Sequence, residues 1–136
     1  MELTAPKDEL SVGVKMLDCD HRTMYDTIHE IRDLAAANED PRKTGSLLLK
    51  LAQFTMTHFA LEEGMMVATK YPGLARHRLN HQRMIEQINA LAAVQSRAGA
   101  PLDQQSLSLL AELHERHIQS DDLHYGCWLN EVGIHQ

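Results

Sequence analysis

The chain of 136 residues is 43% hydrophobic and 24% charged, an ordinary balance for one folded domain spanning residues 1–136. Its formal charge of −6 argues against a nucleic-acid partner, whose phosphates would need a basic surface. No apolar run approaches membrane-spanning length and the N-terminus has no apolar run behind a basic start, so we expect a cytoplasmic protein with no membrane partner.

Prolines, glycines and acidic residues divide the chain into four expected helices. The helices are expected to begin at Asp18 or Asp20, at Asp40–Pro41, at Pro72 and at Asp103, and to end near Asn38, Lys70, "SRAGAP" and Asn130. Strand patterns are nearly absent. The sequence therefore predicts an all-α fold, an antiparallel up-down-up-down four-helix bundle with an irregular N-terminal segment.

All four expected helices carry histidines or carboxylates on stripes that otherwise indicate core. The candidates are His21 on the first helix, His58 and Glu62 on the second, His77 and His81 on the third, and His117 with Asp121 or Asp122 on the fourth. A single histidine on an apolar face is usually a satisfied core or boundary residue, and a histidine–glutamate pair four residues apart is usually a solvated helix pair. Burying all of them unpaired would cost a few kcal/mol each. In an antiparallel bundle they lie toward one end, which favours a shared cation.

The set of donors indicates two metal ions. Five imidazoles and two carboxylates exceed the needs of one tetrahedral zinc and differ from the oxygen-rich sites of calcium and magnesium. With both carboxylates bridging and one bridging oxo or hydroxo group, they fill all but one position of two octahedral ions. Mixed imidazole and carboxylate ligation suits iron, so we expect two iron ions with one position left for a small molecule. A module for zinc or another redox-inert ion is a further alternative.

The runs "LSVGVKMLDCDH", "HFALEEGMM", "YPGLARHRLNH" and "HIQSDD" closely resemble those of the bacterial hemerythrins, over about residues 10–130. The resemblance implies a non-heme di-iron protein that binds O2 for storage, delivery or sensing. The implied ligands are His77, His81 and His117 for one iron, His21 and His58 for the iron that takes O2, and Glu62 and Asp122 as bridges. The implied walls of the O2 pocket are Met24, Phe59, Leu113 and His114.

The chain departs from the family at His114. Where relatives commonly have "WLxxHI" before the last histidine, this sequence has Leu113 and His114, so a titratable donor replaces an apolar residue. His114 either turns to solvent, or it hydrogen-bonds a bound molecule or supplies protons. The second alternative favours a di-iron enzyme with peroxidase or NO-type reactivity over a plain carrier.

Helix geometry alone does not decide between Asp121 and Asp122. Asp121 lies four residues after His117 and shares its helix face, whereas Asp122 would lie about 140° around an ideal helix. The resemblance selects Asp122. We expect Asp121 and Glu63 to be solvated, with Asp121 alternatively accepting a hydrogen bond from a ligand N–H.

Overall fold

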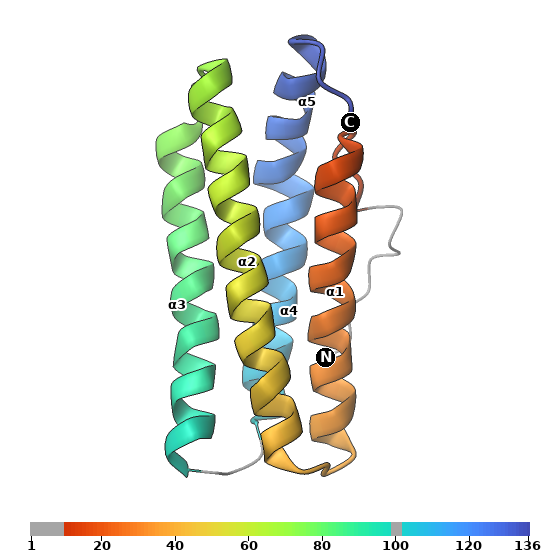
Figure 1. Ribbon diagram of the computed structural model, residues 1–136, viewed down its shortest axis with the longest axis vertical. Helices are drawn as coiled ribbons and strands as arrows, with labels where there is room; N and C mark the ends of the chain where they lie inside the picture. The colour runs from red at the N-terminus through yellow and green to blue at the C-terminus, as the bar shows by residue number, and fades with distance from the viewer. Residues whose placement is uncertain (1–9, 99–101) are drawn as a thin grey trace.

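The computed structural model describes residues 10–98 and 102–136; residues 1–9, with most of the expected N-terminal segment, and residues 99–101 lie outside the described residues. The helices are α1 (Lys15–Ala36), α2 (Pro41–Thr69), α3 (Leu74–Ala98), α4 (Gln104–His117), the π-helical turn η2 (Ile118–Asp122) and α5 (Leu123–Glu131). Figure 1 shows α4, η2 and α5 as one continuous rod, and the chain running alternately down and up the bundle. The described residues contain no strand, so the predicted up-down-up-down four-helix bundle is confirmed.

The helices pack in chain order, and α4 closes the bundle by packing against α1. The close contacts join α1 to α2, α2 to α3, and α3 to α4, so α2 and α4 face each other across the interior (Figure 1). Among the described helices, none combines the length and apolar character that a membrane span needs.

Two expected helix starts are confirmed by their caps. Asp40 accepts a hydrogen bond (3.0 Å) from the main-chain N–H two residues later, and Pro41 is the first helical residue. Asp103 makes the equivalent contact (3.2 Å) at the start of α4. The third helix begins at Leu74, two residues after Pro72.

The expected start of the first helix is wrong. The helix begins at Lys15, before both candidate caps, and no side chain caps it. The carboxylate of Asp18 instead accepts hydrogen bonds from the N–H of Val12 (2.8 Å) and the hydroxyl of Ser11 (2.7 Å). Asp18 therefore holds the preceding segment in place.

Apolar side chains form two clusters, separated along the helices by buried polar residues. The large cluster contains Met24, Ile28, Ile31, Ala35, Leu48, Leu51, Ala52, Phe59, Met84, Ile88, Leu91, Leu102, Leu107, Leu110 and Ala111. The small cluster contains Leu10, Val12, Val14, Leu17, Met66, Ile118, Tyr125 and Leu129. On α1, for example, His21 lies between Leu17 of the small cluster and Met24 of the large one. The candidate metal residues therefore form a polar layer with apolar packing on both sides.

The residues before α1 pack against α5 at Gly126. A Cβ at this position would overlap the main-chain carbonyl of Val12, so only glycine permits the approach. The side-chain amide of Asn130 donates hydrogen bonds to the carbonyls of Gly13 (2.9 Å) and Ile134 (2.8 Å). Leu10, Val12 and Val14 of this segment belong to the small cluster, so the segment covers that end of the interior.

Candidate metal centre

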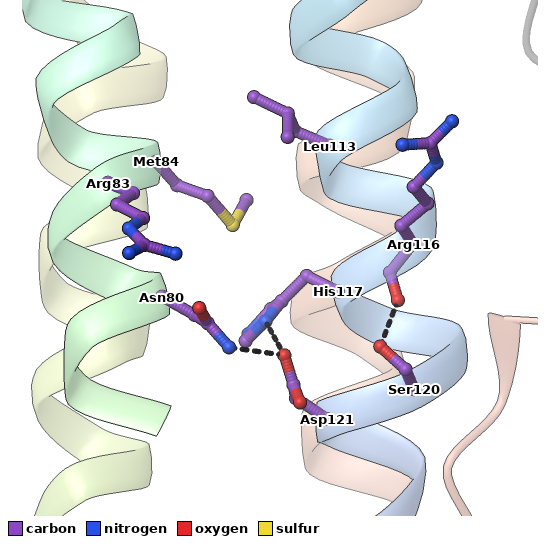
Figure 2. Close-up of a pocket in the computed structure, with 8 residues that line it drawn as sticks. All are labelled: Asn80, Arg83, Met84, Leu113, Arg116, His117, Ser120 and Asp121. Carbon is purple, nitrogen blue, oxygen red and sulfur yellow. Dashed lines mark hydrogen bonds and ion pairs between the residues drawn. The ribbon is translucent and has the colours of Figure 1, made fainter. Parts of the chain in front are cut away.

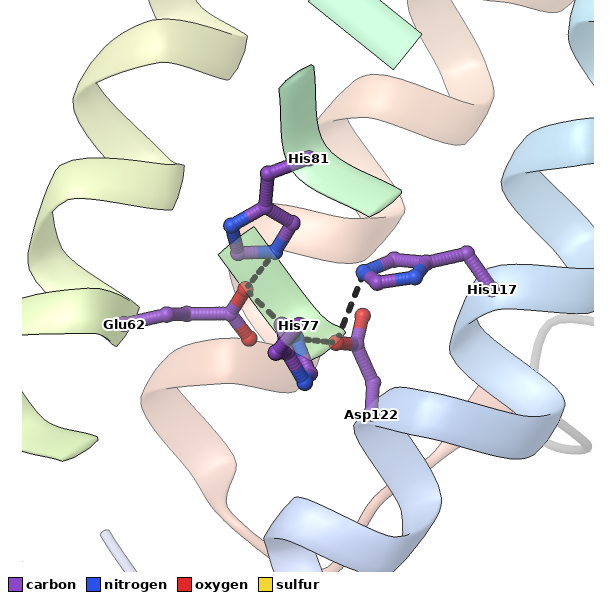
Figure 3. Close-up of side chains that lie close together, drawn as sticks. All are labelled: Glu62, His77, His81, His117 and Asp122. Carbon is purple, nitrogen blue, oxygen red and sulfur yellow. Dashed lines mark ion pairs between the residues drawn. The ribbon is translucent and has the colours of Figure 1, made fainter. Parts of the chain in front are cut away.

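Seven histidine and carboxylate side chains meet inside the bundle, each with 6% or less of its surface exposed. They form two overlapping groups, and within each group the ligand atoms lie within 4.8 Å of one another. The first group contains Glu62, His77, His81, His117 and Asp122 (Figure 3), and the second contains His21, His58 and Glu62. The structure thus brings together all seven residues that the sequence selected as metal candidates.

Asp122 turns one carboxylate oxygen toward each group. Its Oδ1 lies 2.7 Å from Nε2 of His77 and 3.0 Å from Nε2 of His117. Its Oδ2 lies 3.1 Å from Nε2 of His21. A carboxylate in this orientation can bind one cation through each oxygen.

Glu62 lies between the same two groups and belongs to both. Its Oε1 lies 3.1 Å from Nε2 of His81 and 3.5 Å from Nε2 of His58, and its Oε2 lies 3.8 Å from Nε2 of His21. The cluster therefore has two carboxylates at its centre and five imidazoles around them.

The inward-facing atoms of this cluster lie close to one another, but within the described part of the chain none of them has a partner with hydrogen-bond geometry. This holds for Nε2 of all five histidines, both carboxylate oxygens of Glu62 and Oδ1 of Asp122. Such atoms are rare in protein interiors because each costs about 1–3 kcal/mol. Two cations between the nitrogen and carboxylate donors would give these atoms partners, so the residues present fit a pair of metal ions.

Three further carboxylates bind the outward-facing nitrogens of the histidines. Nδ1 of His58 donates to Asp20 (2.9 Å), Nδ1 of His81 to Glu63 (2.9 Å) and Nδ1 of His117 to Asp121 (3.3 Å). Such contacts set the tautomer and ring orientation, so that Nε2 points into the cluster. The expectation that Glu63 is solvated is therefore wrong, and the alternative in which Asp121 accepts from a histidine N–H is confirmed.

Neighbouring side chains hold two of these carboxylates in turn. Nε of Arg78 donates to Glu63 (3.0 Å), and the amide of Asn80 donates to Asp121 (2.6 Å). Sequence patterns mark Asp20 only as a possible helix cap. One feature of the sequence could have indicated that Asp20 orients a ligand. Asp20 directly precedes His21, just as Glu63 and Asp121 directly adjoin the candidate ligands Glu62 and Asp122.

The π-helical turn explains how Asp122 reaches the cluster. The N–H of Leu123 donates to the carbonyl of Ile118, five residues earlier, so this hydrogen-bonded turn contains one residue more than that of an α-helix. Residues five apart then lie on one face, which places Asp122 beside His117. Asp121, at the spacing that an α-helix would favour, contacts the far side of the same ring.

The cluster retains protons when no metal competes for them. Burial opposes protonation of His21, but Asp122 and Glu62 outweigh it and raise the pKa of His21 to about 9. Burial likewise opposes protonation of His117, but Asp122 and Asp121 raise its pKa to about 10. Burial and Asp122 oppose ionisation of Glu62, yet the surrounding imidazoles hold its pKa below the usual range. Metal ions would have to displace these protons.

The candidate pocket residues lie in different places. Met24 and Phe59 are buried in the large cluster, and the Phe59 ring stacks on His81 with centroids 3.6 Å apart. Leu113 is half-buried and lines a surface pocket with Met84 between α3 and α4 (Figure 2). This pocket lies on the side of His117 that carries Asp121, so the role of Leu113 in an O2 pocket stays a prediction.

His114 points into the bundle, so the alternative in which it turns to solvent is wrong. Only 1% of its surface is exposed, and its ring centroid lies 6.5 Å from that of His21. Burial lowers the pKa of His114 to about 3, which leaves the ring neutral. Neither ring nitrogen has a hydrogen-bond partner among the described residues.

Sequence patterns also missed Tyr125. Its side chain is fully buried, and its hydroxyl donates to the main-chain carbonyl of Glu62 (3.2 Å). The available signal is its spacing, eight residues after His117 on the same rod.

Comparison with known proteins agrees with this geometry. The chain is 26% identical over 125 residues to a bacteriohemerythrin of Stenotrophomonas maltophilia, covering 92% of this chain and 80% of that protein. It is 28% identical over 118 residues to a myohemerythrin of Riftia pachyptila, covering 87% of each. A crystal structure of wild-type hemerythrin has the same fold, with a TM-score of 0.84 and 24% identity, over 95% of this chain and 98% of that one. Residues 12–129 match the family described as "Hemerythrin HHE cation binding domain". The chain belongs to the hemerythrin family.

Proposed function

We propose that this chain is a non-heme di-iron protein that binds O2 for storage, delivery or sensing. The observation that carries the proposal is the position of Glu62 and Asp122, two buried carboxylates surrounded by five imidazoles whose Nε2 atoms have no other partner. This donor set suits iron. The relatives named bacteriohemerythrin and myohemerythrin support the same function.

The donors divide unequally between the two ions. The proposed ligands are His77, His81 and His117 for one iron, His21 and His58 for the other, and Glu62 and Asp122 as bridges. With a bridging oxo or hydroxo group, these residues would supply six donors to the first iron and five to the second. The remaining position, on the side of His21 and His58, is where O2 would bind.

The protein's own contribution is to orient the ligands and exclude water. Asp20, Glu63 and Asp121 fix the rings that they contact, and the apolar clusters lie on both sides of the polar layer. Iron would supply the electrons for reversible O2 binding, and the dry surroundings would suppress irreversible oxidation.

Spectroscopy of iron-loaded protein tests this function. We expect two irons per chain, and a visible absorption band that appears when O2 is added to the ferrous protein and disappears when O2 is removed. Asp122→Ala is the matched control, which should lose iron and the band together. A colourless protein that takes up zinc from iron-rich medium would refute the proposal.

The second candidate is an enzyme that reacts with peroxide or NO, favoured by the burial of His114 close to His21. This function predicts irreversible oxidation of the ferrous protein by O2, with turnover of added peroxide or NO. It also predicts slower oxidation in His114→Leu. Equal oxidation rates in wild type and variant would remove it.

We also propose a cytoplasmic location. The two cysteines, Cys19 and Cys127, are exposed and unpaired, which suits a reducing compartment. Fractionation of cells with a marker for each compartment would test the location.

A further inference from the structure

Two buried side chains next to the polar layer have polar atoms that nothing in the described chain satisfies. The side chain of Thr55 is fully buried and that of His114 is 1% exposed. The hydroxyl of Thr55 and both ring nitrogens of His114 lack hydrogen-bond partners among the described residues. Neither residue belongs to the groups that could hold the two metal ions.

Thr55 is unusual among the threonines of this protein. The others that the structure describes each donate to a main-chain carbonyl three or four residues earlier: Thr23, Thr27, Thr44, Thr57 and Thr69. A helical threonine ordinarily satisfies its hydroxyl in this way. The hydroxyl of Thr55 makes no such bond, so it is available to a partner other than a main-chain carbonyl.

Both residues lie one helical turn from a proposed ligand, on the same side of the polar layer. Thr55 precedes His58 by three residues on α2, and His114 precedes His117 by three residues on α4. The next turns in this direction, Leu51 and Leu110, belong to the large cluster. Because α2 and α4 run in the same direction (Figure 1) and each residue precedes a member of the metal cluster by one turn, we place Thr55 and His114 at a similar level of the bundle.

This level of the bundle adjoins His21 and His58, the proposed ligands of the iron that would have five donors. The ring of His114 lies edge-on to that of His21, with centroids 6.5 Å apart and an interplanar angle of 84°. Thr55 shares a helix face with His58, the other ligand proposed for that iron. The two unsatisfied side chains therefore flank the two histidines beside the open coordination position.

We propose that Thr55 and His114 form a hydrogen-bonding cap over this position and contact the outer atom of a small molecule bound there. The ligand class is a diatomic molecule or small anion whose outer atom accepts hydrogen bonds, such as O2, NO or azide. The imidazole N–H of His114 and the hydroxyl of Thr55 are the donors. The inference rests on the proposed di-iron site, but it assigns the retention of the ligand to two residues that bind no metal.

Three variants test the cap by ligand release. Thr55→Val removes the hydroxyl and keeps the shape, and His114→Leu removes the imidazole. Thr44→Val is the control, since Thr44 is equally buried on α2 but its hydroxyl donates to the carbonyl of Pro41 (2.9 Å). We expect O2 release from the iron-loaded protein, measured by stopped flow, to be about tenfold faster in each cap variant. The control should release O2 at the wild-type rate.

Azide release from the diferric protein provides a second measurement that does not depend on O2 chemistry. We again expect faster release from Thr55→Val and His114→Leu than from wild type and Thr44→Val. His114→Gln keeps an N–H donor, so it should release azide more slowly than His114→Leu. If wild type holds two irons and binds azide but not O2, the proposed function fails while the cap can still be tested. If both cap variants keep two irons and release azide and O2 at wild-type rates, the cap is refuted.

The melting temperature of the metal-free protein separates a ligand cap from a purely structural pair. If Thr55 and His114 have no partner in the protein itself, Thr55→Val and His114→Leu should raise the melting temperature, whereas Thr44→Val should lower it. A fall in all three variants would show that the protein or a buried water satisfies both groups. That result would overturn the proposal.

Discussion

The carboxylates behind the histidines should control how tightly the site holds iron. Glu63 accepts a hydrogen bond from Nδ1 of His81 (2.9 Å), and Asp20 accepts one from Nδ1 of His58 (2.9 Å). Loss of such a contact lowers metal affinity about 10- to 100-fold, which corresponds to about 1.4–2.7 kcal/mol. We expect Glu63→Gln, which keeps a neutral acceptor, near the lower limit, and Glu63→Ala near the upper limit.

The two positions should affect different ions. Glu63→Ala acts on the side of the three histidines, and Asp20→Ala on the side of His21 and His58. Each variant should therefore lose one iron before the other as a chelator is added. The contact from His117 to Asp121 is longer (3.3 Å), so Asp121→Ala should have a smaller effect.

Anaerobic competition for ferrous iron against a chelator, with iron counted per chain, measures these affinities. Asp33→Ala is the matched control, because Asp33 lies 3.8 Å from His29 on α1 but both side chains are exposed. The reasoning is refuted if Glu63→Ala holds both irons as tightly as wild type, or if the Asp33 variant loses iron to the same extent.

Three other outcomes are expected. An Asp122→Ala chain should hold at most one iron tightly, and two irons per chain by metal analysis would show that Asp122 is not the bridge. The metal-free protein should lose stability between pH 7 and 10. In the folded protein His21 and His117 keep their protons up to about pH 9 and 10, whereas the unfolded chain releases them near the ordinary pKa of 6.5. Urea midpoints that do not fall over this range would contradict the assignment. Gly126→Ala should destabilise the protein by about 1–3 kcal/mol, because the added Cβ pushes the main chain of Val12 away. It should also speed oxidation of the ferrous site by admitting water, and an unchanged oxidation rate would show that this segment does not seal the site.

Local signals in the sequence were sufficient for most of the fold. Asp40–Pro41 and Asp103 cap helices through contacts within two residues, so their role can be predicted without knowing the tertiary structure. Asp18 has the same carboxylate, but its oxygens accept hydrogen bonds from Ser11 and Val12, in a segment that folds back on the helix. No local pattern distinguishes these two uses of an aspartate.

Regular helical spacing identified the histidines but not the second carboxylate. An α-helix would place Asp121 beside His117, and the π-helical turn that substitutes Asp122 has no clear sequence signature. Here the family resemblance was needed. The burial of His114 was equally beyond prediction, because an unpartnered interior imidazole is unfavourable for the chain alone.

We also expect the polar layer to affect how the protein unfolds. Without metal, the large and small clusters of the described residues are joined through the helix backbones and a layer of buried imidazoles and carboxylates. We expect hydrogen exchange in this apoprotein to show that the end containing the small cluster opens at a lower free energy than the rest, before the main unfolding transition. Ions that bind residues from all four helices would join the two ends into a single cooperative unit. The metal would then act as the central element of the interior, and its loss would divide one folding unit into two.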